Sequence, residues 1–140
     1  MKTEKIDPKA LLSSLWIFAT LNYLYCDIMG LMDAHLLNQY LTGTVGGMEM
    51  TENFLLGAAV LMEIPIAMVL LSRVLKHKTN RWANIIAGII MTFIQTATLL
   101  VGSPTKYYLF CSMIEIATTI FILWYALKWK NSDILINEQK

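Results

Sequence analysis

The sequence predicts an all-α integral membrane protein, a four-helix bundle with both termini in the cytoplasm. Hydrophobic residues make up 56% of its 140 residues, which is more than soluble domains usually contain. Four apolar segments are long enough to cross a hydrocarbon layer of roughly 30 Å, which requires about 20 helical residues. Charged residues are concentrated in the short segments that flank them. A lipid bilayer is therefore the expected environment.

The four predicted helices are residues 11–32, 52–75, 82–102 and 107–128, in a single membrane domain that covers residues 1–140. Three lysines precede the first helix, as in a signal peptide. Its apolar run is too long for a signal peptide, however, and no small-residue cleavage site follows it. We therefore expect this first helix to be retained.

The two connections on the predicted outer side differ in length. Residues 102–106, GSPTK, predict a tight turn because Gly and Pro favour helix ends and starts. Residues 33–51 are long for a helix hairpin. Within them, AHLLNQYL predicts a short helix at the membrane surface, and GTVGG ends it. This segment is interpreted either as a surface connection anchored by its leucines or as a lid over an outward-facing pocket.

The basic residues predict the orientation of the chain in the membrane. Ten of the eleven lie in the N-terminal segment, the loop around residues 76–81 and the C-terminal segment, whereas Lys106 alone lies on the opposite side. Lysine and arginine are enriched in cytoplasmic loops. The chain is thus predicted to be a multi-pass protein of the cell membrane whose N-terminus and C-terminus are both cytoplasmic.

A weak internal similarity suggests two duplicated helical hairpins. Shifting the second helix by 52 positions onto the fourth gives six identities, including Glu63 with Glu115. Shifting the first helix onto the third pairs little beyond Trp16 with Trp82. Parallel repeats of this kind occur in membrane transporters. Duplication therefore remains a hypothesis.

Each predicted helix carries one strongly polar residue between the outer interface and the middle of the bilayer: Asp27, Glu63, Gln95 and Glu115. A charged side chain facing lipid costs about 3 kcal/mol or more, so such residues usually face the bundle interior. No lysine or arginine lies at the same depth to pair with them. The carboxyl groups are therefore expected to be neutral or hydrogen-bonded inside the bundle.

Helical spacing adds companions to these residues. Tyr23 lies one turn before Asp27, and Pro65, two residues after Glu63, is expected to kink the second helix. The candidates for ligand binding or proton acceptance are Glu63, Glu115, Asp27, Gln95, Tyr23 and Asn22. The alternative is an interhelical hydrogen-bond network that only holds the bundle together, at about 0.6–2 kcal/mol per bond. For Asn22 an ordinary interhelical bond is the favoured interpretation.

The sequence gives only weak indications of redox chemistry, metal binding or catalysis. Cys26 and Cys111 lie at similar depth and could face each other, but they lack C-x-x-C spacing. Small packing residues are the favoured interpretation and a redox pair is the alternative. His35 and His77 lie on opposite sides, so no shared metal site is predicted. The sequence has no catalytic motif, identifies no cofactor and carries no basic patch suited to nucleic acid.

Three segments carry a resemblance to known proteins: LWIFATLNYLYCDIMGLMD at 15–33, LMEIP at 61–65 and RWANIIAGIIMTFIQ at 81–95. With them the chain resembles a bacterial family of unknown function made of small four-helix membrane proteins. More loosely it is similar to the DoxX-like superfamily, in which a Gly precedes an acid in the second helix, here Gly57 and Glu63. The resemblance implies a four-helix fold and a role for Glu63.

Three functional hypotheses follow. The first is a protein that binds or moves a small amphipathic or lipophilic molecule, with Glu63 and Glu115 as central polar contacts. The second is an accessory subunit, whose partner is another membrane protein or a second copy of the chain. The third is a membrane-embedded isomerase or oxidoreductase that uses two carboxylates as acid and base. An enzyme is the less favoured of these classes.

Overall fold

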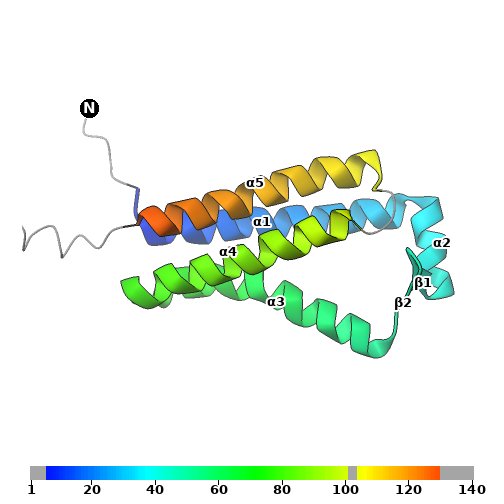
Figure 1. Ribbon diagram of the computed structural model, residues 1–140, viewed down its shortest axis with the longest axis horizontal. Coiled ribbons are helices and arrows are strands. Elements are labelled where there is room, and N and C mark those ends of the chain that lie inside the picture. The colour runs from blue at the N-terminus through cyan, green and yellow to red at the C-terminus, as the bar shows by residue number, and fades with distance from the viewer. Residues whose placement is uncertain (1–5, 101–103, 130–140) are drawn as a thin grey trace, which may run out of the picture.

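The computed structural model describes residues 6–100 and 104–129. These residues form five α-helices and one two-stranded hairpin, so the predicted all-α class is confirmed (Figure 1). Four of the helices are long and apolar enough to cross a membrane. Lys2, Lys5, Lys130 and Lys140, which support the predicted orientation, lie outside the described residues.

The four long helices are α1 (Pro8–Met32), α3 (Glu52–Val74), α4 (His77–Leu99) and α5 (Lys106–Lys128). The largest difference from the predicted boundaries is at α4, which begins five residues before position 82. A hydropathy pattern marks the part of a helix that lies in hydrocarbon, whereas the helix itself continues into the polar residues HKTNR. Residues 101 and 102, its predicted end, lie outside the described residues.

Aspartate side chains cap the start of α1 and the start of the helix that follows it. The Asp7 carboxylate accepts a hydrogen bond from the Lys9 backbone N–H at 3.2 Å, and Pro8 occupies the first turn. Asp33 ends α1 and also begins α2 (Ala34–Thr42). Its carboxylate accepts bonds from the backbone N–H groups of His35 and Leu36, at 2.9 and 3.3 Å. One acid therefore joins two helices at a sharp change of direction.

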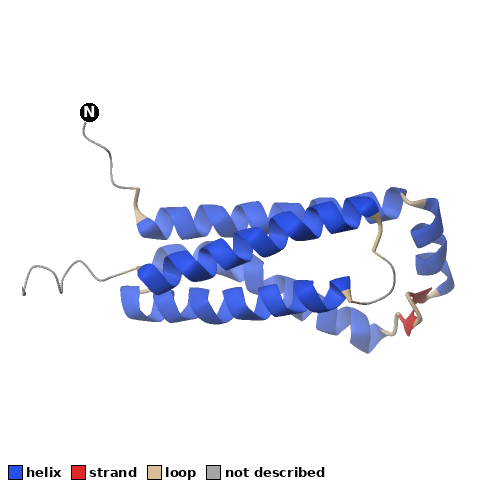
Figure 2. Ribbon diagram, turned by 45° about the horizontal axis from the view of Figure 1, so that its top comes forward, coloured by secondary structure: helices blue, strands red, loops and turns tan. Residues whose placement is uncertain are grey.

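A small hairpin follows α2. Gly43 ends the helix with a φ of 75°, and strands β1 (Thr44–Val45) and β2 (Met48–Glu49) pair antiparallel (Figure 2). Gly46 and Gly47 turn the chain with φ values of 58° and 83°, as a two-residue type I′ turn requires. The GTVGG segment was expected only to end a helix, so this hairpin was not predicted.

The long helices form a ring in which α1 and α4 each pack against both α3 and α5. One end of the bundle holds the start of α1, the α3–α4 connection and the end of α5 (Figure 1). We call it the basic end, because it carries Arg73, Lys76, Lys78, Arg81 and Lys128. The opposite end, with α2, the hairpin and the α4–α5 connection, is called the loop end.

Helix α3 is the least covered of the four long helices. Only 11% of its most apolar window is buried, compared with 28–39% in the others. All residues from 51 to 60 are exposed, and Figure 1 shows α3 diverging from α4 towards the loop end. Pro65 lies inside the helix, where the missing N–H and the ring favour a bend. The bundle is thus tightly packed at the basic end and more open along α3.

Candidate functional site

The most unusual buried group of the described chain is the Glu115 carboxyl on α5. Its side chain is 1% exposed, yet neither carboxylate oxygen has a hydrogen-bond partner among the described residues. The hydroxyl of Tyr23 on α1, which is near enough to interact electrostatically with Glu115, is also buried and unpartnered. A buried polar group without a partner costs about 1–3 kcal/mol, and more when it is charged. These groups are positioned to receive a partner that the chain itself does not supply.

Cys26 and Cys111 lie beside this pair. Both are buried reduced thiols, 6% and 5% exposed, and their side chains are close enough to interact with each other. Cys26 is also within electrostatic range of Glu115. We refer to Tyr23, Cys26, Cys111 and Glu115 together as the Glu115 cluster.

Gln95 lies on α4 next to this cluster and is already satisfied. Its amide Nε2 donates to the Ser112 hydroxyl at 2.9 Å, and one turn deeper Thr92 donates to Thr119 at 2.8 Å. Both bonds join α4 to α5. Gln95 therefore acts in this structure as an interhelical contact, in agreement with the bundle-holding interpretation.

Asp27 and Asn22 lie at the margin of the site. Asp27 is exposed on α1, although its carboxylate is near enough to interact electrostatically with Glu115 and Tyr40. The Asn22 amide donates to the Phe18 carbonyl of its own helix at 2.8 Å. The expected interhelical bond of Asn22 is therefore replaced by a bond within α1, because an asparagine can reach the carbonyl one turn earlier.

Glu63 does not join the Glu115 cluster. It lies on the exposed surface of α3, so the expectation that it faces the bundle interior is wrong for the isolated chain. The physical reason is the divergence of α3 from α4, which leaves residues 51–60 exposed and Glu63 on an uncovered face of the helix. The two acids aligned by the proposed duplication thus occupy different environments, one exposed and the other buried.

A pocket of about 470 Å³ opens at the loop end. It is lined by residues of α2, the hairpin, α4, α5 and the segments that join them: Asp33, His35, Leu36, Gln39, Tyr40, Val45, Gly46, Met48, Thr98, Pro104, Thr105, Tyr107 and Tyr108. The Gln39 amide oxygen accepts a bond from the Gly46 N–H at 3.0 Å and so holds the hairpin against α2. The long connection formed by α2 and the hairpin is therefore a wall of this pocket.

The tyrosines give the pocket polar groups. The Tyr108 hydroxyl donates to Thr98 at 2.9 Å, and Tyr108 lies near Ser112 and Glu115, on the side towards the Glu115 cluster. Partial burial, assisted by the negative charge of Asp27, raises the pKa of Tyr40. The Tyr40 phenol therefore stays neutral at physiological pH and can donate a hydrogen bond.

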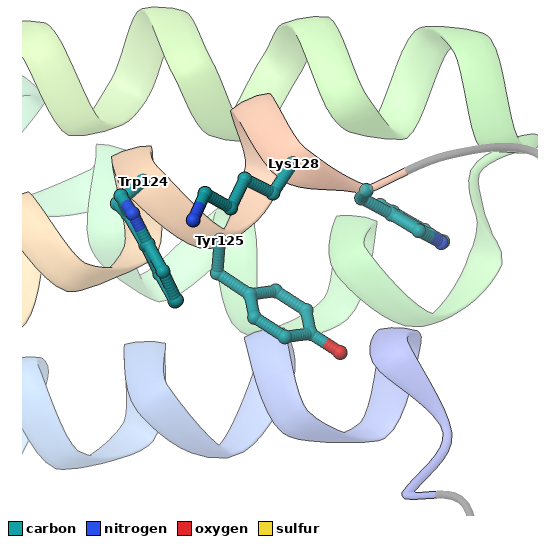
Figure 3. Close-up of a pocket in the computed structure, with 4 residues that line it drawn as sticks. Trp124, Tyr125 and Lys128 are labelled. Atoms are coloured by element: carbon teal, nitrogen blue, oxygen red, sulfur yellow. The ribbon is translucent and has the colours of Figure 1, made fainter.

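A second pocket, of about 270 Å³, lies at the basic end and is lined by Trp124, Tyr125, Lys128 and Trp129. Figure 3 shows the Lys128 side chain extended towards Trp124, and its ammonium lies 4.3 Å from the centre of that ring. Lysine and tryptophan side chains of this kind anchor helix ends at a membrane interface.

Comparison with known proteins assigns the chain to a family. It matches the family of unknown function DUF6326 over residues 3–136. The chain belongs to this family. No curated protein and no solved structure matches it. The expected membership of a family of unknown function is confirmed, whereas the DoxX-like similarity is not. Membership of DUF6326 adds no function to what the geometry indicates, and the described residues contain no cluster of three metal-ligating side chains.

Sequence reasoning missed one feature of this DUF6326 protein, a buried polar network towards the basic end. The Trp16 indole N–H donates to the Asn84 amide oxygen at 2.7 Å, and the Ser72 hydroxyl donates to the same oxygen at 3.3 Å. The Asn84 amide donates to the Asn80 side chain at 2.7 Å, and Asn80 donates to the Ser72 carbonyl. All four residues are fully buried. Two asparagines one helical turn apart were the available signal, Asn80 just before the predicted helix start at residue 82 and Asn84 just after it.

Proposed function

We propose that this protein binds a small amphipathic or lipophilic molecule, with the polar group of that molecule directed to the Glu115 cluster. The observation that carries the proposal is the buried carboxyl of Glu115, whose two oxygens have no partner among the described residues. A chain gains nothing in stability from such a group, because a hydrophobic side chain of similar size would avoid the desolvation cost. A ligand that hydrogen-bonds to Glu115 and Tyr23 accounts for both unpartnered groups.

The size and lining of the loop-end pocket support the same function. A volume of about 470 Å³ falls within the range of small-molecule sites, which combine apolar walls with a few polar groups. Tyr108 lies at this pocket, and Ser112 and Glu115 follow it at one-turn intervals on α5. The polar head of a ligand would thus approach Glu115 past Tyr108, while its apolar part contacts Leu36, Val45 and Met48.

The protonation state of Glu115 would control which ligand head groups the protein can bind. A neutral carboxylic acid donates one hydrogen bond, whereas a carboxylate only accepts. Proton binding therefore changes which head groups Glu115 can hold. This provides a means of coupling ligand uptake or movement to a proton.

The test is native mass spectrometry of protein released from a mild detergent. Wild type is expected to carry a bound small molecule, and Glu115→Gln is expected to lose it, because the amide changes the hydrogen-bonding pattern and cannot ionise. Glu63→Gln is the matched control, since it makes the same chemical change at an exposed acid. Loss of ligand in both variants, or retention in both, would count against the proposal.

A specific observation favours a second, structural candidate function. Glu63 is exposed on α3 between Ala59 and Ala67, which lie one turn away on either side. A carboxyl facing lipid costs about 3 kcal/mol or more, and small residues allow close helix approach. We infer that α3 packs against α3 of a second copy, where two neutral Glu63 carboxyls can hydrogen-bond to each other across a twofold axis.

The same mass spectra test this second candidate through the oligomeric state. Wild type, Glu115→Gln and Glu63→Gln are expected to be dimeric, because a glutamine amide can donate and accept as a neutral carboxyl does. Glu63→Leu, which cannot hydrogen-bond, is expected to shift towards monomer. A monomeric wild type, or a heteromeric assembly with another membrane protein in place of the dimer, would overturn it. The two acids thus give separable outcomes, ligand loss at Glu115 and dissociation at Glu63.

A further inference from the structure

We propose that Cys26 and Cys111 form a redox-active dithiol site that reduces small lipophilic disulfides and is itself converted to a disulfide linking α1 to α5. The two thiols come from helices that pack directly against each other. Cys26 lies six residues before the end of α1, and Cys111 five residues after the start of α5. Because α1 and α5 run in opposite directions (Figure 1), these positions lie at nearly the same depth.

The surroundings of the pair distinguish it from ordinary packing cysteines. Buried cysteines are normally inert, because burial and neighbouring negative charge oppose formation of the thiolate, so a reactive pair here needs a group that takes the thiol proton directly. Here the unpartnered carboxyl of Glu115 lies one helical turn from Cys111 and within electrostatic range of Cys26. The unpartnered hydroxyl of Tyr23 lies one turn from Cys26. The site thus holds two thiols, a proton acceptor and a hydrogen-bond donor.

The reaction balances without any further oxidant. The Cys111 thiol gives its proton to the Glu115 carboxylate, and the thiolate attacks one sulfur of R–S–S–R. A Cys111–S–S–R bond forms, and the departing RS⁻ takes the proton from Glu115 as RSH. The Cys26 thiol then loses its proton to Glu115 and attacks the sulfur of Cys111. The Cys26–Cys111 bond forms and the second RS⁻ leaves as RSH, so two protein thiols are oxidised and one disulfide is reduced.

The buried location of the two cysteines limits the kind of disulfide that can reach them. Both sulfurs are buried in the apolar bundle, where a charged disulfide would bear a large desolvation cost. Cys111 lies one turn below Tyr108 of the loop-end pocket, so the substrate reaches Cys111 first. A neutral, lipid-soluble disulfide meets both requirements. This inference does not depend on the ligand proposed above, because the thiol pair can react in protein that carries none.

The test uses intact protein in mild detergent with dithiodipyridine, a neutral aromatic disulfide, and follows the mass of the protein. Wild type is expected to lose two hydrogen atoms and carry no adduct. Cys26→Ser should instead retain one thiopyridyl adduct on Cys111. Glu115→Gln should slow the reaction at least about tenfold and leave only the pH dependence of the thiols themselves, whereas Glu63→Gln should do neither.

Wild type that carries two adducts, or that remains unmodified while folded, would overturn the dithiol site. An unchanged rate in Glu115→Gln would overturn the role of Glu115 as the proton acceptor. A positive thiol result combined with an absent native ligand would leave the dithiol site standing and reject the proposed ligand binding, so the two failures are distinguishable.

Discussion

Among single residues, Asn84 makes the most connections in the buried polar network. It accepts from Trp16 and Ser72 and donates to Asn80, and so connects α1, α3 and α4 through one amide group. Interhelical hydrogen bonds in membranes contribute only about 0.6–2 kcal/mol each. Their removal costs more when a partner is left buried and unpaired.

Replacing Asn84 with alanine should lower the free energy of unfolding by about 2 kcal/mol, because the Trp16 indole N–H would lose its acceptor. Unfolding in a denaturing detergent would measure this change. Asn22→Ala is the control, since the Asn22 amide bonds only to its own helix. Equal stability of the two variants would show that the network does not hold the bundle.

At the same scale, Glu115 and Glu63 show the limit of sequence reasoning about side chains. Both are glutamates at a predicted depth between the outer interface and the middle of the bilayer, and the sequence gives no reason to expect different surroundings for them. Their environments differ because one helix diverges at Pro65 while the other stays packed. Helical spacing gives the face on which a residue lies, but which face is covered depends on how the helices are arranged.

Among the elements, the connection of α2 and the hairpin has the greatest consequence for the proposed site. Three glycines in left-handed backbone conformations shape it. Gly43 stops the helix, and Gly46 and Gly47 form the turn. Other residues adopt these φ values only with strain. The wall of the loop-end pocket therefore depends on positions where the backbone conformation strains any residue with a side chain.

Gly47→Ala should destabilise the hairpin by about 1 kcal/mol, because a side chain is strained at a φ of 83° even though no atom obstructs it. Gly57→Ala is the matched control. That glycine lies in α3 with open space around it and an ordinary helical backbone, so alanine should be neutral or slightly stabilising. Hydrogen exchange of residues 44–49 would measure the difference, and equal exchange would contradict it.

The four long helices could be predicted because length and apolar content alone specify a membrane span. The hairpin could not, because two residues per strand give no periodic pattern and only the paired glycines mark its turn. The start of α4 was predicted five residues too late, because a hydropathy pattern does not mark a polar helical segment. Residues 77–81 are polar, but they continue the helix because Asn80 is buried against Ser72.

For the whole molecule, the two ends of the bundle differ in charge and in openness. The basic end gathers the cationic side chains and the tryptophans of the second pocket. The loop end holds the larger pocket and the Glu115 cluster. We propose that the basic end faces the cytoplasm, following the bias of lysine and arginine towards that side.

Reporter fusions test this orientation. A fluorescent protein that folds only in the cytoplasm should be active at either terminus, and an enzyme that requires the outer compartment should be inactive at both. A chemical tag inserted at Gly46 should react from outside the cell. Labelling of that tag only after the cells are opened would reverse the orientation and place the loop-end pocket on the cytoplasmic side.

The sequence also predicted part of the site at this scale. Glu115 and Tyr23 were both among the candidate residues, although the sequence paired Tyr23 with Asp27 and not with Glu115. The long connection after α1, for which a lid over a pocket was one interpretation, lines a pocket. Cys26 and Cys111 are adjacent although no motif links them, because antiparallel helices bring together positions that lie far apart in the chain. The sequence placed the two cysteines at similar depth, but only the packing of α1 against α5 shows that they are neighbours.

An experimental structure of the protein in nanodiscs of its native lipid tests the central proposal most directly. The account predicts density for a non-protein molecule within hydrogen-bonding distance of the Glu115 carboxyl and extending past Tyr108 into the loop-end pocket. A closed pocket, with both Glu115 oxygens hydrogen-bonded to other side chains of the same chain, would contradict it.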